Sequence, residues 1–419
     1  MGFHVKFGKE NVFLIVCIMG FLAILSSTMS KSPVLPYFAG YLGTSEFWLG
    51  LVGSASTIPG ILISLPAGSL SDIFGRRRIL LVSAFVFASA PFLYLVINSW
   101  WELALVRFYH GFATGMFVPV AQAMIAEAYP ARRGERISLF SSATAVGRST
   151  APLLGGSILV VTNPGLLPRE YTNFFYIYLV VGVVGITALL TTLPFLRQRK
   201  SGTSAVGQPK TNVGSVVRQW MSIARTRGVL AVSLIEAGQY YVYGSVEFFL
   251  VKYMTDVSLI GGEMQSVILF SLVIAVMLSR PLVGRLSDKT GRRTPIILGC
   301  IVSGIPLVFV PFFTQFPVLL ALAIAYGLGF SMVTSVTPAF VSELVPIEVV
   351  GGAMGFISTL MDIGQTLGPL VCGFILGTHL GYVGLFASLA LVLMITVFTF
   401  VMVRRSRSTR VVRTYEKIR

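Results

Sequence analysis

One stretch of the sequence, residues 229–252, combines a long apolar run with polar side chains at helical spacing. Four of these side chains recur at i, i+4, i+7 and i+11 and a fifth lies beside them: Glu236, Tyr240, Tyr243 and Glu247, with Gln239 adjacent. Residues at this spacing share one face of a helix, and two carboxylates are costly on a face that contacts lipid. We therefore expect this face to line a cavity.

The two glutamates suggest different chemistry. A carboxyl group removed from water favours its neutral form, which suits a side chain that picks up and releases protons. Glu236 is nearer the predicted cytoplasmic end, and we expect it to couple transport to protons or to bind a cation. Glu247 has an alternative interpretation as a solvated residue at the outer edge.

Four further ionisable residues fall inside apolar runs: Arg107, His110, Arg148 and Asp362. Arg107 is either the partner of a protonating acid or part of a structural ion pair. His110 either titrates near neutrality or is a neutral, hydrogen-bonded side chain. Arg148 and Asp362 near mid-depth either form ion pairs, or Arg148 joins Arg107 and Lys31 in making a cavity attractive to anions.

The composition indicates that these side chains are positioned by membrane-spanning helices. Of the 419 residues, 55% are hydrophobic and only 11% are charged, whereas soluble domains carry about 25% charged residues. Apolar runs of about 20 residues, long enough to cross a bilayer as helices, recur along the chain. The twelve predicted spans are 11–31, 46–67, 79–98, 102–124, 137–161, 171–195, 229–252, 263–284, 294–313, 317–340, 350–376 and 381–403.

The basic residues are distributed unevenly between the predicted loops. They follow the even-numbered spans and fill the tail 404–419, whereas the alternate loops carry little positive charge. The loop after the tenth span is an exception, because it carries Glu343 and Glu348 and no Lys or Arg. By the positive-inside rule, both termini and the even-numbered loops face the cytoplasm of a cell-membrane protein. Topology thus explains the net charge of +16 without nucleic acid as a partner.

Several function classes are disfavoured. No G-x-x-x-x-G-K-[ST] phosphate loop is present, and no nucleophile stands with a base. His4, His110 and His379 are too scattered to suggest a metal site. We therefore expect neither an enzyme, nor a cofactor, nor a bound metal.

A charged loop occurs twice, 216 positions apart. GSLSDIFGRRRILL at 68–81 is matched by GRLSDKTGRRTPII at 284–297, and AEAYP at 126–130 is matched by SELVP at 342–346. GRSTAPLLGG at 147–156 likewise corresponds to GQTLGPLVCG at 364–373. These matches indicate a duplicated six-helix unit, hence an all-α fold of two halves related by pseudo-two-fold symmetry. The predicted parts are two bundles, 1–196 and 229–403, a cytoplasmic linker, 197–228, and a cytoplasmic tail, 404–419.

The repeated segments supply two further groups of candidate residues. The charged loops give one group: Gly68, Asp72, Gly75, Arg76 and Arg77 in the first copy, and Gly284, Asp288 and Arg292 in the second. The second pair of segments gives small residues and prolines: Gly147, Pro152, Gly155, Gly156, Gly364, Gly368 and Pro369. Small residues let helices approach closely and proline bends them, so plain packing is an alternative to a functional interface.

Three motifs resemble those of the major facilitator superfamily. The loop 68–78 is similar to its signature between helices 2 and 3, and Leu103-x-x-x-Arg107-x-x-His110-Gly111 resembles its helix 4 motif, with His110 in place of the usual Gln. The segment 147–156 resembles the helix 5 motif of its antiporters, with Ala151 in place of Gly. The resemblance implies a latch formed by the charged loop, and a substrate site between the halves near the bilayer midplane.

The expected function is therefore secondary active transport by alternating access, in the manner of a drug:proton antiporter that exports small amphiphilic molecules. The expected partners are the substrate, protons and membrane lipids, and the expected state is a monomer. One alternative is a symporter or uniporter of an organic anion or lipid-like metabolite. A non-transporting membrane sensor is a further alternative, although such proteins tend to carry longer soluble extensions.

Overall fold

The computed structural model describes residues 9–63, 71, 74–129, 132–197, 225–345 and 350–402. Within these ranges every regular element is an α-helix or a short 3-10 helix, and no strand occurs. The expected all-α class is thus confirmed. Helices suit the apolar sequence because they satisfy their backbone hydrogen bonds internally, as a segment in lipid must.

Ten helices among the described residues are long and apolar enough to cross a membrane. Two more helices, α5 (Arg76–Leu93) and α10 (Arg227–Asp256), coincide with predicted spans but are not among these ten. Three arginines begin α5, and α10 contains the two glutamates singled out above. Together, these helices are consistent with the twelve expected spans. The helix rich in candidate residues, α10, is among the less apolar helices.

The contacts within the chain divide it into two units. Unit 1 comprises Met1–Thr44 and Ala55–Lys210, and unit 2 comprises Ser45–Ser54 and Thr211–Arg419. The helices of unit 1 are α1 (Lys9–Met29), α2 (Val34–Tyr41), α5, α6 (Trp100–Ala128), α7 (Arg133–Thr162) and α8 (Phe175–Arg197). Those of unit 2 are α3 (Glu46–Ser54), α10, α11 (Gly262–Thr290), α12 (Arg293–Phe309), α13 (Phe316–Thr334), α14 (Thr337–Leu344), α15 (Val350–Leu376) and α16 (Gly381–Met402). The predicted linker, except its two ends, and the predicted tail lie outside the described residues, so these boundaries stay predictions.

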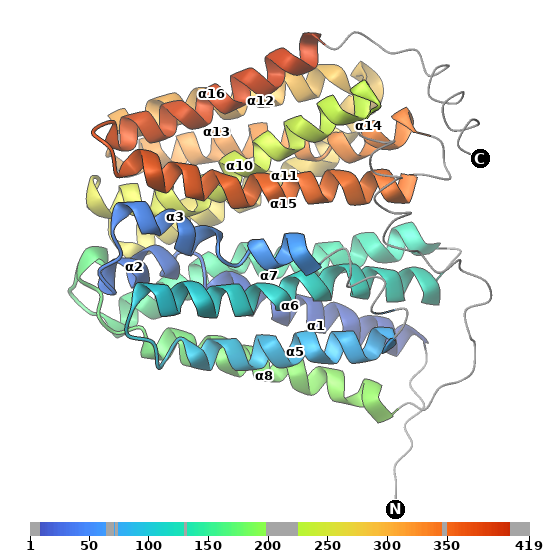
Figure 1. Cartoon of the computed structure of the whole chain (residues 1–419), viewed down its shortest axis with the longest axis horizontal. Coiled ribbons are helices and arrows are strands. Elements are labelled where there is room, and N and C mark those ends of the chain that lie inside the picture. The colour runs from blue at the N-terminus through green and yellow to red at the C-terminus, as the bar shows by residue number, and fades with distance from the viewer. Residues whose placement is uncertain are drawn as a thin grey trace, which may run out of the picture. The chain divides into compact units, whose positions relative to one another are not determined.

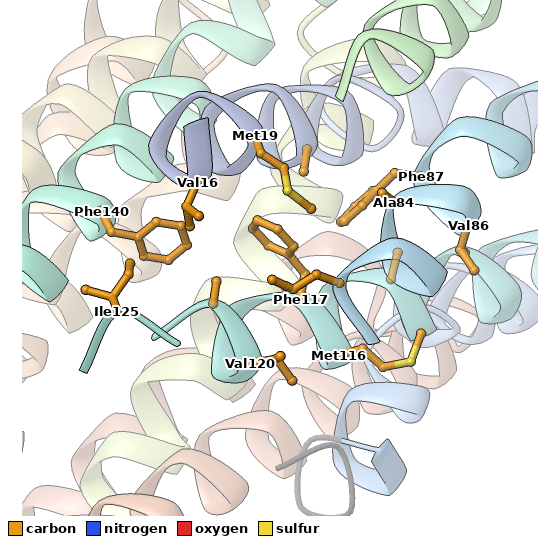
Figure 2. Close-up of a cluster of buried hydrophobic side chains, with 14 of the residues drawn as sticks. Val16, Met19, Ala84, Val86, Phe87, Met116, Phe117, Val120, Ile125 and Phe140 are labelled. Carbon is orange, nitrogen blue, oxygen red and sulfur yellow. The ribbon is translucent and has the colours of Figure 1, made fainter. Parts of the chain in front are cut away.

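Unit 1 is built from long helices that pack lengthwise, with α5 against α6 and α8, and α1 against α7 (Figure 1). Its core is a cluster of buried apolar side chains drawn from four helices (Figure 2). Met19 of α1, Phe87 of α5, Phe117 of α6 and Phe140 of α7 are members of this cluster. Side chains of such size fix the spacing of the helices that carry the polar residues of unit 1.

In unit 2, α15 packs along α10, and the short helix α3 packs on α15. The Ser54 hydroxyl of α3 donates a 2.6 Å hydrogen bond to the Thr366 carbonyl of α15. A separate apolar core includes Val232 of α10, Ile296 of α12 and Phe400 of α16. α10 is therefore held on several sides, and its face is positioned by packing rather than by a loop.

The internal repeat is visible in helix contacts inside each unit. Gly111 of α6 lies against the backbone carbonyl of Ser56, and Gly327 of α13 lies against that of Leu272. Gly327 is 216 positions after Gly111, and Leu272 is likewise 216 positions after Ser56. A Cβ at either glycine would be closer to that carbonyl oxygen than van der Waals contact allows, so the close approach depends on glycine in both copies.

A second pair of contacts repeats in the same way. Gly147 of α7 approaches the carbonyl of Phe21 in α1, and Gly364 of α15 approaches that of Ala237 in α10. The small residues of 147–156 and 364–373 thus pack helices together within their own units. Gly368 adds to this packing at the Tyr241 carbonyl. A role of these segments in the transport cycle stays a prediction.

Candidate functional site

Glu236 lies in the interior of unit 2, on α10, with 4% of its surface exposed. The Thr337 hydroxyl at the start of α14 donates a hydrogen bond to Glu236 Oε2. Arg280 of α11 also attracts the carboxylate electrostatically. The buried acid thus has a neutral donor and a cation nearby, so both its charged and its neutral form have a partner.

Gln239 points from α10 toward α12. Its side-chain nitrogen donates to the Cys300 thiol and to the Ser303 hydroxyl, each at 3.3 Å. Its side-chain oxygen is buried and has no hydrogen-bond partner among the described residues. The structure therefore places Gln239 in a polar contact between helices, one turn from Glu236.

The two tyrosines of α10 meet aromatic residues of α13. The Tyr243 ring stacks on Phe330 at 4.8 Å between centroids, and Tyr240 meets the same ring edge-on at 5.3 Å. Tyr326, one turn before Phe330, is buried, and its hydroxyl lacks a hydrogen-bond partner among the described residues. We call Tyr240, Tyr243, Tyr326 and Phe330 the aromatic cluster.

Glu247 extends the aromatic cluster with a negative charge. It is half-buried, and its carboxylate interacts electrostatically with Tyr326. An aromatic surface beside a carboxylate offers both an apolar contact and a partner for a cation. The predicted polar face of α10 is therefore divided between a buried acid near α14 and an aromatic, acidic surface near α13.

Asp362 lies on α15, half-buried, one turn before Thr366. Its carboxylate has no hydrogen-bond or ion-pair partner among the described residues of unit 2. Arg148 on α7 is exposed within unit 1. Among the described residues of its own unit, neither of these mid-depth charges forms an ion pair.

The polar residues of α6 form a separate cluster in unit 1. Arg107 is 2% exposed, and its Nη2 donates to the Ser56 hydroxyl at 2.5 Å. Tyr94, directly after the end of α5, interacts with the Arg107 guanidinium, and its hydroxyl lies 3.5 Å from His110 Nδ1. Tyr178 of α8 stacks on Tyr94 at 4.5 Å. We call these five residues the arginine cluster.

The repeated charged loops share one contact in both copies. Arg76 donates to the Ser71 hydroxyl, and Arg292 donates to the Ser287 hydroxyl at 2.6 Å. The residue before each arginine, Gly75 or Gly291, has a positive φ, +92° or +83°, which only glycine adopts without strain. Gly68 and Asp72 lie outside the described residues.

The second loop carries an ion-pair network. Arg292 lies 2.6 Å from the Asp288 carboxylate and 2.8 Å from that of Glu343, at the end of α14. The hydrogen bond with Glu343, with smaller contributions from Asp288, raises the pKa of Arg292 above its usual value. The loop between α11 and α12 is thereby tied to α14.

The structure also describes two other candidate residues of the loops. A Cβ added at Gly284 would meet open space, and the Arg77 side chain is half-buried.

Sequence reasoning missed five of these participants: Arg280, Thr337, Glu343 and the two tyrosines of the arginine cluster, Tyr94 and Tyr178. A signal existed for Glu343, because the glutamate is kept in both AEAYP and SELVP. A signal also existed for Arg280, a charge inside a predicted span. Thr337 and the tyrosines are residue types common in any helix, so nothing in the sequence distinguishes them.

Comparison with known proteins identifies the class of protein to which this arrangement belongs. The sequence profile of the Major Facilitator Superfamily matches residues 16–279 and 260–418. The multidrug resistance protein MdtG of Citrobacter koseri is 27% identical over 90% of this chain and 91% of its own length. The multi-drug resistance efflux pump PmrA homolog of Lactococcus lactis is 26% identical over 88% of this chain and 89% of its own length.

The fold also matches solved structures. The bacterial homolog of the human lysosomal transporter Spinster, in an inward-facing and unoccupied conformation, superimposes with a TM-score of 0.73 at 16% identity, covering 94% of this chain and 95% of that one. The chain belongs to the major facilitator superfamily. It is an integral multi-pass membrane protein and a transporter rather than an enzyme.

Proposed function

We propose that the protein exports small amphiphilic molecules in exchange for protons, by exposing one binding site alternately to the two sides of the membrane. The observation that carries this proposal is Glu236, a buried carboxyl group in the span α10 with Thr337 and Arg280 as partners. A carboxylate is costly in a membrane interior, and one that changes its protonation state there can couple a conformational change to a proton. The drug-efflux names of two relatives support the choice of substrate class.

The aromatic cluster and Glu247 supply the substrate contacts in this proposal. Aromatic rings offer an apolar surface that tolerates many ligand shapes, and the carboxylate favours ligands with a positive charge. Glu236 lies on α10 together with two members of the aromatic cluster, Tyr240 and Tyr243. A movement of α10 that follows protonation of Glu236 would therefore also move the substrate contacts.

The two charged loops act as the latch of the cycle. The Arg292 network ties the start of α12 to the end of α14 through charges that are partly exposed. Partly exposed pairs are weak enough to open and close during turnover. In the same proposal the basic loops and both termini face the cytoplasm, and the protein works as a monomer among the lipids of the cell membrane.

The proposal is tested by transport into and out of liposomes that contain the purified protein. We expect efflux of a fluorescent amphiphile to depend on a pH gradient and to collapse when an ionophore dissipates it. Glu236→Gln should keep binding and lose gradient-driven transport, while Glu263→Gln, an exposed carboxylate at the start of α11, should behave as the unmodified protein. Equal transport with and without the gradient would refute proton coupling.

The second candidate function is symport or uniport of an organic anion. It is favoured by Arg107, a buried cation whose partners in the described part of unit 1 are neutral. Counterflow against matched cationic and anionic compounds separates the two candidates. Accumulation of the anions only would select the second one.

A further inference from the structure

The Arg107 guanidinium is buried in unit 1, and no carboxylate pairs with it among the residues that the structure describes there. Two acidic residues of unit 1 have described side chains, and both are engaged elsewhere. Glu102 accepts hydrogen bonds from the backbone amides of Asn98 and Ser99, and Glu170 pairs with Arg169. Among the described residues of this unit, the partners of Arg107 are therefore neutral.

Such an arrangement is unfavourable for the ligand-free protein. An arginine keeps its charge under all ordinary conditions, so burial cannot be relieved by loss of a proton. A buried charge without a counter-ion destabilises the folded protein, and removing one partner of a buried ion pair is strongly destabilising for this reason. Arg107 therefore needs either a strong structural reason or an anion.

Three atoms of the arginine cluster indicate where an anion would bind. Arg107 Nε, His110 Nε2 and the Tyr178 hydroxyl are buried and lack hydrogen-bond partners among the described residues. His110 Nδ1 faces the Tyr94 hydroxyl; when Nδ1 accepts a hydrogen bond from this hydroxyl, the proton of the neutral ring is on Nε2, which is then a donor. Buried donors without partners are rare in native proteins, and three in one cluster call for a shared acceptor.

We propose that the arginine cluster binds one small monoanionic group, either an inorganic anion or the carboxylate of an amphiphile. One guanidinium supplies one unit of charge, and the surrounding hydroxyl and imidazole groups supply neutral donors, which matches a single negative charge. The stacked rings of Tyr94 and Tyr178 give the site an aromatic wall for an apolar tail. This inference goes beyond the proposed function, because anion binding requires neither a proton gradient nor transport.

The test is thermal unfolding of the purified full chain in detergent, in a zwitterionic buffer without added salt. Sodium chloride probes an inorganic anion, and sodium octanoate against octanamide probes a carboxylate on an unchanged tail. A ligand that binds the folded state raises the unfolding temperature in a saturable manner. We expect saturation with chloride, with octanoate, or with both, and no effect of octanamide.

Substitutions connect the shift to the cluster. Arg107→Gln should weaken the apparent affinity at least ten-fold, whereas Arg169→Gln, which removes the same charge from an exposed loop, should leave it unchanged. Tyr178→Phe keeps the ring stack and removes only the donor, and should weaken binding about three-fold or more. Should Arg107→Gln not fold, Tyr178→Phe and His110→Gln decide the question. The proposal would be overturned if neither anion gave a saturable rise in the unfolding temperature, or if these variants bound the anion with unchanged affinity. The proposed function would not be affected by this result, because it depends on gradient-driven transport alone.

Discussion

Arg292 and Glu343 join two helices through a pair of contacts with one oxygen: Arg292 Nε donates to Glu343 Oε1 at 2.9 Å, and Nη2 lies 2.8 Å from the same atom. Arg292 precedes α12, and Glu343 is one residue before the end of α14. Both belong to segments that occur twice in the sequence. A residue pair kept through a duplication in this way is expected to serve the transport cycle.

Removing this pair should affect transport more than stability. Because both side chains are partly exposed, Arg292→Gln should lower the free energy of unfolding by about 1 kcal/mol or less. The transport rate should fall by a larger factor, because the variant loses a contact of the proposed latch. Thermal unfolding and vesicle transport measure the two effects, with Arg285→Gln, an exposed arginine nearby, as control. A variant that loses stability and transport in proportion would contradict the latch.

The Thr337 hydroxyl should matter for coupling through its bond to Glu236. Thr337→Val keeps the shape and removes the donor, and a hydrogen bond to a charged group contributes about 1.5–3 kcal/mol. We expect gradient-driven transport to fall about ten-fold or more, since 1.4 kcal/mol corresponds to a factor of ten. Thr337→Ser should retain most of the activity. If Val and Ser variants transport alike, the hydroxyl has no role in coupling.

Phe330 should contribute to substrate affinity. It contacts both tyrosines of α10, and aromatic pairs contribute about 0.5–1.5 kcal/mol beyond area burial. Phe330→Leu should raise the apparent KM for an amphiphile about two- to twelve-fold with little change in kcat. Phe330→Tyr, which keeps the ring, should remain near the original value. A change confined to kcat would place this ring outside the substrate contacts.

Gly364 should be intolerant of a side chain. A Cβ there would collide with the Ala237 carbonyl and force α15 away from α10, and overpacking of this kind costs about 1–3 kcal/mol. Gly364→Ala should therefore lower the unfolding temperature. Gly261→Ala is the matched control, because it has open space and a φ of −61°. Equal unfolding temperatures of the two variants would show that α15 can move away from α10 without a loss of stability.

The sequence predicted the helices well because each span needs an uninterrupted apolar run, and it predicted Glu236 because a carboxylate in such a run is conspicuous. It could not predict Thr337 as the partner of Glu236, since that contact joins residues 101 positions apart and a threonine fits many places in a helix. Arg280 was overlooked because it lies near a predicted cytoplasmic end, where basic residues usually signal topology. The neutral surroundings of Arg107 also depend on helix packing, which periodicity does not specify.

The central claim is that Glu236 carries the proton that is exchanged for substrate. It is tested most directly by measuring proton movement, with a pH-sensitive dye inside liposomes that contain the protein and no imposed pH gradient. An outward or inward gradient of a transported amphiphile should drive protons in the opposite direction with the unmodified protein and with Glu263→Gln. With Glu236→Gln the amphiphile should still bind, but no proton movement should follow. Proton movement by Glu236→Gln at the rate of the unmodified protein would contradict the account.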